Sequence, residues 1–350
     1  MTQAVPSPQS CLRHTFLQDK NRAEPHPETE AVPHVINTVP EEKADMQTAS
    51  DSVRITPQER LSETLRTVSP GTCILLEPGI YREKIEITVP GIRLIGHSPQ
   101  DTKIVFGDYA EKRDETGTAY NTFRTYTAAV LQPHVSFCGL TVENDALEPE
   151  IKGQEVALSV IADDFTAENC VFRSTQDTVF CGPLPEDLIR RYDGFLKPAL
   201  RRGGSMRQVF RECLIAGNVD FIFGCGDALF SGCEIRSVTD VRGGGYAAAP
   251  AHAAEQQIGF VFADCRFTCD GAVADESVFL ARPWRDYGKC SFIACTYGRH
   301  ITPEGFNKWN DTARDRTARF SEFGEIPPGR VPWSRRLTPA EKDALLRFFD

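Results

Sequence analysis

Short apolar runs separated by turn residues dominate the chain from residue 73 onward. Runs rich in β-branched and aromatic residues, divided by glycine and polar residues, are typical of strands rather than helices. They predict strands at 73–76, 85–89, 92–95, 103–106, 128–131, 135–142, 156–161, 165–172, 208–214, 221–223, 228–235, 258–267, 278–280 and 290–293. So many short strands at regular spacing predict an all-β sandwich, barrel or solenoid.

A recurring phrase favours the solenoid. A cysteine followed two residues later by Ile or Phe occurs at Cys170, Cys213, Cys233 and Cys265, with gaps of 43, 20 and 32 residues. A base period near 20, lengthened by insertions, is typical of coils that stack and carry their variation in loops. We therefore expect a β-solenoid, with chance recurrence in a β-sandwich as the alternative.

The two ends of the chain depart from this pattern. Residues 1–50 are poor in aromatics and hold several prolines and charged clusters, which predicts a flexible extension before one domain at 51–350. Thr56 with Glu59, and Thr338 with Glu341, have the spacing of capping boxes. Each predicts a short helix that caps one end of the stack, the second within 338–350.

Composition limits the classes of partner and the compartment. The net charge of −10 argues against nucleic acid, because phosphate binding needs a basic surface. The first 20 residues lack the apolar stretch of a secretion signal, and no run of about 20 apolar residues predicts a membrane span. The twelve cysteines lie mostly in apolar runs, which favours buried reduced thiols over disulfides. We expect a cytoplasmic monomer, with secretion as the alternative.

Two aspartates stand at the same place in two repeats. Asp177 follows Cys170 by seven residues, and Asp220 follows Cys213 by seven. Equal offsets in stacked coils put the two carboxyl groups on neighbouring strands, about 4.8 Å apart. Carboxyl groups that close cannot easily both ionise, so one tends to keep its proton and can act as an acid beside an ionised nucleophile or base. Asp240 has the same offset from Cys233 but lies in a polar stretch, which favours a loop.

Three further residues complete a candidate catalytic set. Arg282 offers a guanidinium that can grip a carboxylate with two hydrogen bonds, although a surface salt bridge is its alternative. Trp284 suits a sugar-stacking platform or a core aromatic. Gln154 lies one coil before Asp177, and its amide can donate to an oxyanion, although a surface position is equally open.

Together these motifs resemble the pectinesterases, the pectin methylesterases built on a right-handed parallel β-helix. The resemblance covers roughly residues 52–335. It rests on 78–84 (PGIYREK), 92–96 (IRLIG), Gln154 with 156–158 (VAL), 176–178 (QDT), 217–224 (GNVDFIFG), 282–284 (RPW) and, more weakly, 303–309 (PEGFNKW). It implies an all-β, right-handed parallel β-helix with short capping helices at both ends.

The resemblance also implies the roles of the residues. Asp220 resembles the nucleophile that attacks the C6 methyl ester of galacturonate, and Asp177 the acid that protonates methanol and then activates water. Gln154 and Gln176 resemble the oxyanion donors, and Arg282 the cation that keeps Asp220 ionised. Substrate contacts are implied for Trp284, Phe221 and Phe180. Pectin or methylated oligogalacturonides are the implied partners, with no metal or other cofactor.

Some positions depart from the family pattern. Phe180 replaces a frequent tyrosine, Ala281 replaces the glycine before 282–284, and Phe306 replaces a tryptophan. The interval from Asp177 to Asp220 is about twice the usual one, because of an inserted loop at roughly 182–206. Six basic and three acidic residues between 182 and 207 leave this loop at +3, which predicts a positive patch near the cleft that attracts de-esterified galacturonate.

Other functions remain open from the sequence alone. They are a catalytically silent β-helix that binds carbohydrate, an esterase of the same mechanism on a non-pectin ester, and a β-helix lyase or glycoside hydrolase. A lyase needs a calcium-binding acidic cluster, and an inverting hydrolase needs carboxyl groups about 6.5–9.5 Å apart. No Gly-x-Ser-x-Gly motif is present, so a serine esterase is disfavoured.

Overall fold

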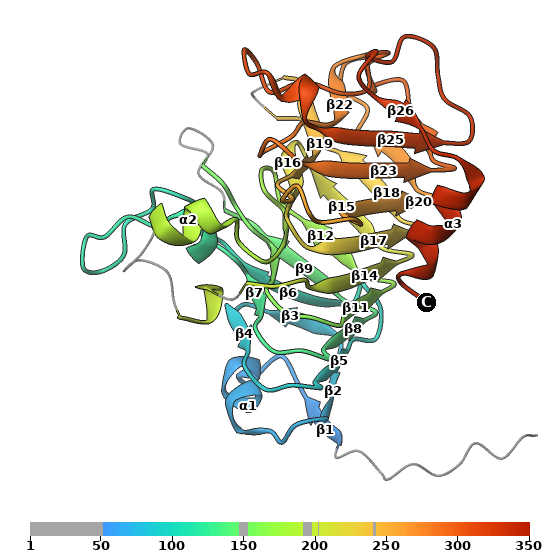
Figure 1. Cartoon of the computed structure of the whole chain (residues 1–350). Coiled ribbons are helices and arrows are strands. Elements are labelled where there is room, and N and C mark those ends of the chain that lie inside the picture. Colours follow the sequence, from blue (N-terminus) through green and yellow to red (C-terminus); the bar gives the residue numbers. More distant parts are fainter. Residues whose placement is uncertain (1–51, 147–152, 192–197, 202, 241–242) are drawn as a thin grey trace, which may run out of the picture. The chain divides into compact units, whose positions relative to one another are not determined.

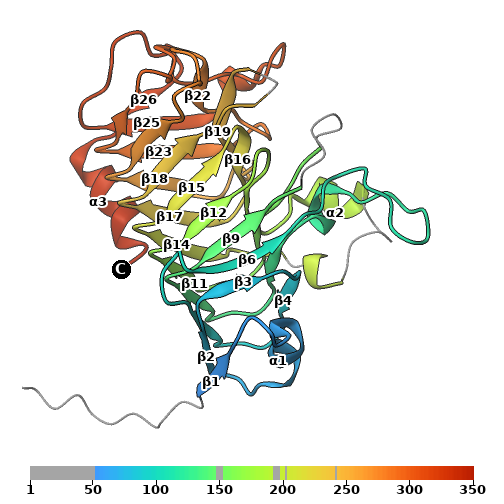
Figure 2. The same cartoon turned by 180° about the vertical axis from the view of Figure 1, so that it is seen from behind.

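Three parallel β-sheets run along one stack of coils (Figure 1, Figure 2). The computed structural model describes residues 52–146, 153–191, 198–201, 203–240 and 243–350. The central coils contribute one strand to each sheet, the terminal coils contribute fewer, and the strand pairs between coils are parallel. The predicted parallel β-helix is confirmed. The extension predicted at 1–50 lies outside the described residues.

The strands of each sheet follow one another in chain order along the stack. Sheet A contains β1 (Ser52–Ile55), β2 (Cys73–Leu76), β5 (Arg93–Ile95), β8 (Ser136–Cys138), β11 (Phe165–Glu168), β14 (Arg207–Arg211), β17 (Asp227–Ser231), β20 (Phe260–Ala263), β23 (Lys289–Ile293), β25 (Arg319–Phe323) and β26 (Arg335–Arg336). Sheet B contains β3 (Gly79–Tyr81), β6 (Thr102–Phe106), β9 (Thr141–Asn144), β12 (Val171–Arg173), β15 (Leu214–Gly217), β18 (Glu234–Ser237), β21 (Arg266–Cys269) and β24 (Thr296–Tyr297). Sheet C contains β4 (Ile85–Ile87), β7 (Ala128–Val130), β10 (Leu158–Val160), β13 (Val179–Cys181), β16 (Val219–Gly224), β19 (Gly245–Pro250) and β22 (Val278–Ala281).

The recurring cysteines mark a corner between sheets A and B. Several runs predicted as one strand are in fact two, because the residue before the cysteine has a left-handed backbone that turns the chain. These corner residues include Asn169, Glu212 and Asp264, with φ of 49°, 50° and 54°. The cysteine that follows each corner is buried in the core. The repeat therefore reports the corner of each coil rather than the middle of a strand.

Aromatic rings stack inside the coils. Phe210, Phe230, Phe262 and Phe292 occupy paired positions on successive strands of sheet A. Their ring centroids are 4.9, 4.7 and 4.9 Å apart, and the rings are nearly parallel. The spacing matches the distance of about 4.8 Å between neighbouring strands. Equivalent side chains of successive coils thus pack on one another along the core.

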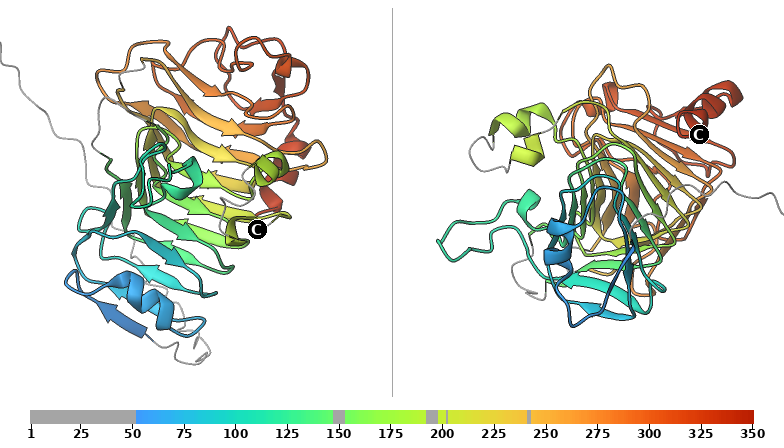
Figure 3. Two further views of the ribbon diagram at one scale, coloured as in Figure 1. Left: turned by 90° about the vertical axis from the view of Figure 1, so that its left-hand side faces the viewer. Right: turned by 90° about the horizontal axis from the view of Figure 1, so that it is seen from below.

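Helices and 3₁₀ turns lie outside the coils. They are α1 (Leu61–Thr67), α2 (Glu186–Arg191), α3 (Pro339–Arg347), η1 (Thr122–Arg124), η2 (Pro198–Arg201) and η3 (Arg314–Arg316). Figure 3 shows α2 and the loop that carries η1 projecting from the same side of the stack. None of the helices in the described ranges is long and apolar enough to cross a membrane.

Helix α1 is present, but its predicted cap is wrong. The helix starts at Leu61, and its N-terminal residue Arg60 makes no side-chain cap. The Thr56 and Glu59 side chains do bond to each other, but within a turn that precedes the helix. The helix N-terminus is instead capped by Glu83, whose carboxylate accepts from the amides of Leu61 and Ser62 at 2.8 and 3.1 Å. A residue 22 positions away in the sequence supplies the cap, so local pattern could not reveal it.

Helix α3 begins with the capping box predicted at Thr338 and Glu341, which is confirmed. Its Leu345 and the following Phe349 pack with Val209, Leu229 and other outward-facing residues of sheet A. The helix therefore lies along the side of several coils rather than only over the last one (Figure 1). Phe306, Phe320 and Trp333 pack together beside the final coils.

Candidate active site

The two aspartates lie on neighbouring coils at the start of sheet C. Gln176 pairs with Val219, and Val179 pairs with Ile222, so the register sets Asp177 opposite Asp220. The Asp177 amide donates to the Val219 carbonyl at 3.1 Å. Each aspartate is 8% exposed. The side-by-side placement predicted from the equal offsets is therefore present in the structure.

Both aspartates have a left-handed backbone. The φ of Asp177 is 64° and that of Asp220 is 51°. At Asp220 the register against β19 also shifts between Val219 and Ile222, which is a β-bulge. Left-handed non-glycine residues and bulges are costly local features that gather at functional sites and re-aim side chains. Here they turn two carboxyl groups out of the coils into one cleft.

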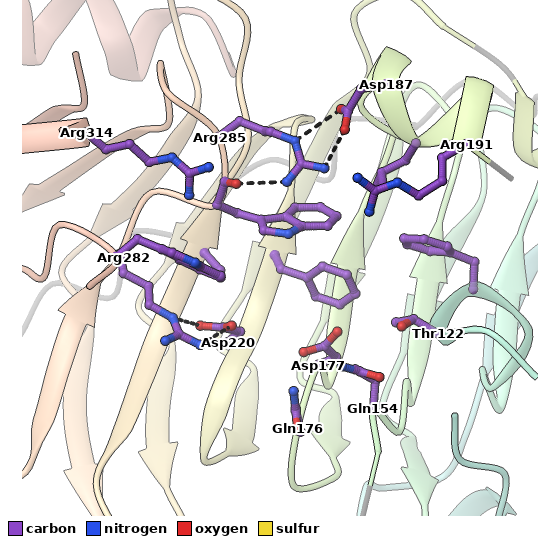
Figure 4. Close-up of a pocket in the computed structure, with 16 residues that line it drawn as sticks. Thr122, Gln154, Gln176, Asp177, Asp187, Arg191, Asp220, Arg282, Arg285 and Arg314 are labelled. Carbon is purple, nitrogen blue, oxygen red and sulfur yellow. Dashed lines mark hydrogen bonds and ion pairs between the residues drawn. The ribbon is translucent and has the colours of Figure 1, made fainter. Parts of the chain in front are cut away.

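Arg282 grips Asp220 as the sequence suggested. It follows β22 directly, and its backbone amide donates to the Ala248 carbonyl at 2.9 Å. Its Nε and Nη2 donate to the two carboxylate oxygens of Asp220, both at 2.7 Å (Figure 4). The guanidinium also lies between the rings of Tyr246 and Trp309, at 3.7 and 4.0 Å from their centroids. Two aromatic faces and a bidentate carboxylate thus hold this cation in one orientation.

A cleft of about 540 Å³ surrounds this pair. Asp177, Gln154, Gln176 and Trp284 line it, so the structure brings these predicted residues together with Asp220 and Arg282. Asp187, Leu188 and Arg191 belong to the inserted loop that was predicted to lie near the cleft. The lining residues that the sequence did not predict are Thr122, Phe123, Phe223, Ala249, Arg285, Trp309 and Arg314. Trp309 belongs to the weak late motif, Phe223 to the 217–224 motif, and Arg285 follows the 282–284 motif, and these positions are signals that could have marked them.

Backbone hydrogen bonds to neighbouring segments hold the two glutamines in place. The Gln176 carbonyl accepts from the Glu155 amide at 3.0 Å, and the Gln154 carbonyl accepts from the Ala110 amide at 2.9 Å. Their side chains line the cleft with Asp177 (Figure 4). Because a side-chain amide carries two N–H donors, the arrangement can supply hydrogen bonds to a developing oxyanion.

Phe221 and Phe180 do not reach the cleft. Phe221 is 0% exposed in the main core, because the bulge that turns Asp220 outward turns the next side chain inward. Phe180 is also 0% exposed and packs between Phe123 and Phe223, with centroid distances of 5.2 and 5.0 Å. Phe123 and Phe223, rather than Phe180, present aromatic surface to the cleft. The structure thus does not reproduce the substrate contacts expected of Phe180 and Phe221.

The inserted loop supplies one wall of the cleft. Asp187, Leu188 and Arg191 of α2 line it, and Leu188 packs in a cluster with Phe123 and Phe223. Arg285 donates to Asp187 from Nε at 3.1 Å and from Nη2 at 2.8 Å, and its guanidinium lies 4.7 Å from the Trp284 ring. Tyr192, Lys197 and Arg202 of the loop lie outside the described residues.

No group of three or more metal-binding side chains occurs in the part of the chain that the structure describes. The cleft offers carboxyl, amide and guanidinium groups. A carboxylate held by a bidentate arginine, beside a second carboxyl group and two amides, can act as nucleophile, acid and oxyanion donors.

Comparison with known proteins identifies the family of the chain. The family model described as Pectinesterase matches residues 37–183 and 202–344. Pectinesterase 31 of Arabidopsis thaliana is 31% identical over 308 residues, which cover 85% of this chain and 84% of the relative. Pectinesterase QRT1 of Arabidopsis thaliana is 31% identical over 279 residues, which cover 77% of this chain but only 66% of the relative's length.

Solved structures share the fold. A crystal structure of pectin methylesterase in complex with hexasaccharide VII has a TM-score of 0.70 and 23% identity, and covers 85% of this chain and 95% of that one. The pectin methylesterase from carrot has a TM-score of 0.68 and 22% identity, with coverage of 85% and 91%. At this identity the likeness concerns the parallel β-helix alone.

Proposed function

The chain belongs to the pectinesterase family, whose members are carboxylic ester hydrolases, and on that premise we propose that it removes methyl esters from C6 of galacturonate units. Asp220 is the proposed nucleophile and Asp177 the proposed acid and base. The observation that carries this assignment is the bidentate contact of Arg282 with Asp220 beside Asp177. It gives two neighbouring carboxyl groups different surroundings, as acid and nucleophile require.

The first half of the reaction forms an acyl-enzyme. A carboxylate oxygen of Asp220 attacks the ester carbonyl carbon, and the carbonyl oxygen becomes an oxyanion that accepts hydrogen bonds from the Gln154 and Gln176 amides. The intermediate collapses as the bond to the methoxy oxygen breaks. Asp177 gives its proton to that oxygen, and methanol leaves.

The second half restores the enzyme. Asp177, now ionised, takes a proton from water as the water oxygen attacks the acyl carbon. The bond to Asp220 breaks, which leaves a galacturonic acid group and an ionised Asp220, and the acid group then loses its proton to solvent. Asp177 has its proton again, so both groups are ready for another cycle. Each step uses side chains of this chain alone.

The shape of the cleft supports a sugar chain as the substrate. Trp284, Phe123 and Phe223 offer aromatic faces, which suit the apolar faces of sugar rings, beside polar side chains that can bind hydroxyl groups. The solved relative bound to a hexasaccharide is consistent with an oligosaccharide in this groove. Pectin or methylated oligogalacturonides are therefore the proposed substrates.

Methanol release tests the proposal directly. Asp220→Asn should abolish release from highly methylated pectin and from short methylated oligomers, with or without chelator, and Asp177→Asn should be similarly severe. Asp264→Asn is a matched control, because Asp264 also has a left-handed backbone but is exposed at a corner between sheets A and B. Asp220→Asn activity within about tenfold of wild type, a barrier change of about 1.4 kcal/mol, would remove Asp220 from the nucleophile role.

The same assay separates the other candidate functions. A silent carbohydrate-binding β-helix would bind oligomers without releasing methanol, and an esterase for another substrate would hydrolyse small acyl esters but not pectin.

We further propose that the enzyme is a monomer in the cytoplasm. The free thiols of every described cysteine support a reducing compartment. Cell fractionation and sedimentation would test this placement.

A further inference from the structure

A second arginine–aspartate pair crosses the rim of the cleft. Asp187 lies in the first turn of α2, and Arg285 lies 98 residues later in the loop after β22. The Arg285 guanidinium gives both Nε and Nη2 to the Asp187 carboxylate and a further hydrogen bond to the Trp284 carbonyl at 2.9 Å (Figure 4). The proposed chemistry uses neither residue of this pair.

The rim pair lies between the catalytic cleft and a second hollow. Asp187, Arg285 and Arg314 line the catalytic cleft and also a second hollow of about 960 Å³. A chain that continues from the cleft into this hollow therefore runs beside the Asp187–Arg285 contact. The contact is also open to solvent, since the side chains of Arg285 and Asp187 are 26% and 45% exposed.

Three guanidinium groups gather at this rim, where Asp187 pairs with Arg285 and Asp286 pairs with Arg314 at 3.0 Å. Arg191, Arg285 and Arg314 line the cleft on the side away from Asp177 (Figure 4). The pKa of Asp187 lies below its ordinary value, first because Arg285 donates hydrogen bonds to the carboxylate and also because the charges of Arg285 and Arg191 favour the ionised form. Asp187 is therefore an anion at neutral pH and holds the donors that a substrate carboxylate would use.

We infer that Asp187 is a specificity-determining residue that weakens the binding of de-esterified galacturonate at the rim. This inference rests on the proposed function. A free galacturonate carboxylate needs the bidentate donors of Arg285, which Asp187 already occupies, and it also meets the negative charge of Asp187. A methyl-esterified unit carries no charge, so it neither competes with Asp187 for Arg285 nor is repelled by the Asp187 carboxylate. The arginines attract carboxylates, and Asp187 limits that attraction so that the de-esterified product leaves more readily.

The expected size of the effect follows from the exposure of the pair. Exposed ion pairs contribute at most about 1 kcal/mol, which corresponds to roughly a fivefold change in a binding constant. Such a contact can be displaced by a ligand but still biases the choice between ligands. Removing the Asp187 charge should therefore raise the affinity for a fully de-esterified oligomer about fivefold.

Direct binding of hexagalacturonate, measured by calorimetry, tests the inference without relying on turnover. Asp187→Asn should lower Kd about fivefold, and Asp187→Glu should stay near wild type because it keeps the charge. Arg285→Gln should raise Kd. Asp164→Asn is the matched control: it removes a carboxylate from another exposed arginine–aspartate pair, with Arg207, and Asp164 lines neither the cleft nor the second hollow. The gain in Asp187→Asn should shrink as salt rises from about 0.05 to 0.5 M, because salt screens exposed charges.

Each outcome bears on one idea. An unchanged Kd in Asp187→Asn, an equal gain in Asp164→Asn, or no hexagalacturonate binding to any form overturns the inference, even if methanol release is normal. Loss of methanol release from wild type would overturn the proposed function instead. Thermal unfolding of each variant identifies one that has failed to fold, in which case Asp187→Ser serves in place of Asp187→Asn.

Discussion

The floor and the rim of the cleft each hold a bidentate arginine–aspartate pair, and the arginines are only three positions apart in the sequence. At the floor, Arg282 and Asp220 are 14% and 11% exposed, and two aromatic rings enclose the guanidinium. At the rim, Arg285 and Asp187 are 26% and 45% exposed, and one ring lies beside the guanidinium. Similar contacts thus have different surroundings. A partly buried pair fixes a reactive group, whereas an exposed one can exchange partners.

Replacing each arginine in turn by a neutral residue should give the largest difference between the floor pair and the rim pair. We expect Arg282→Gln to lower kcat about 10²–10³-fold and to destabilise the fold by about 3 kcal/mol, because it leaves the Asp220 charge without its cation. Arg285→Gln should change stability by less than about 1 kcal/mol and should act mainly on KM for charged oligomers. Methanol release and chemical denaturation measure both. Equal effects of the two substitutions on activity and stability would mean that the difference in burial does not give the two pairs different roles.

The basic residues of the inserted loop should give a smaller effect, confined to the rim. Changing Arg190, Arg191, Arg201 and Arg202 together to serine should raise KM for partly de-esterified oligomers roughly two- to fivefold and weaken its dependence on salt. Arg191 should account for most of this, since it lines the cleft. Arg190→Ser alone is the control, because Arg190 pairs with Glu186 away from the cleft. An unchanged KM and salt slope in the fourfold variant would show that the loop is only a surface elaboration.

The buried cysteines of the core should react least with a thiol reagent in the native protein. In denaturant without reductant, a thiol reagent should titrate close to all twelve cysteines, whereas the native protein should react at few, with Cys11 first. Burial raises the pKa of Cys225 to about 12 and also raises that of Cys290, so their reactive thiolate forms are scarce as well as inaccessible. Detection of several disulfides would contradict both the predicted reduced thiols and the proposed cytoplasmic location.

The sequence by itself determined the stack of coils and the floor of the cleft. Both depend on periodicity, because residues at equal offsets in successive coils become neighbours. That is why Asp177 and Asp220 could be paired in advance and why the recurring cysteines indicated a solenoid. Even there, the resemblance implied a substrate contact for Phe221, whereas the structure buries this side chain in the core after the bulge at Asp220.

Only the tertiary structure decided which loops meet. Glu83 caps α1 from 22 residues away, Trp309 covers Arg282, and Asp187 reaches Arg285 across 98 residues. These contacts join segments of unequal length that leave the coils at different places, so no fixed interval in the sequence marks them. Periodic burial sets the coils because every repeat faces the same core, whereas the rim depends on where each insertion folds back against its neighbours.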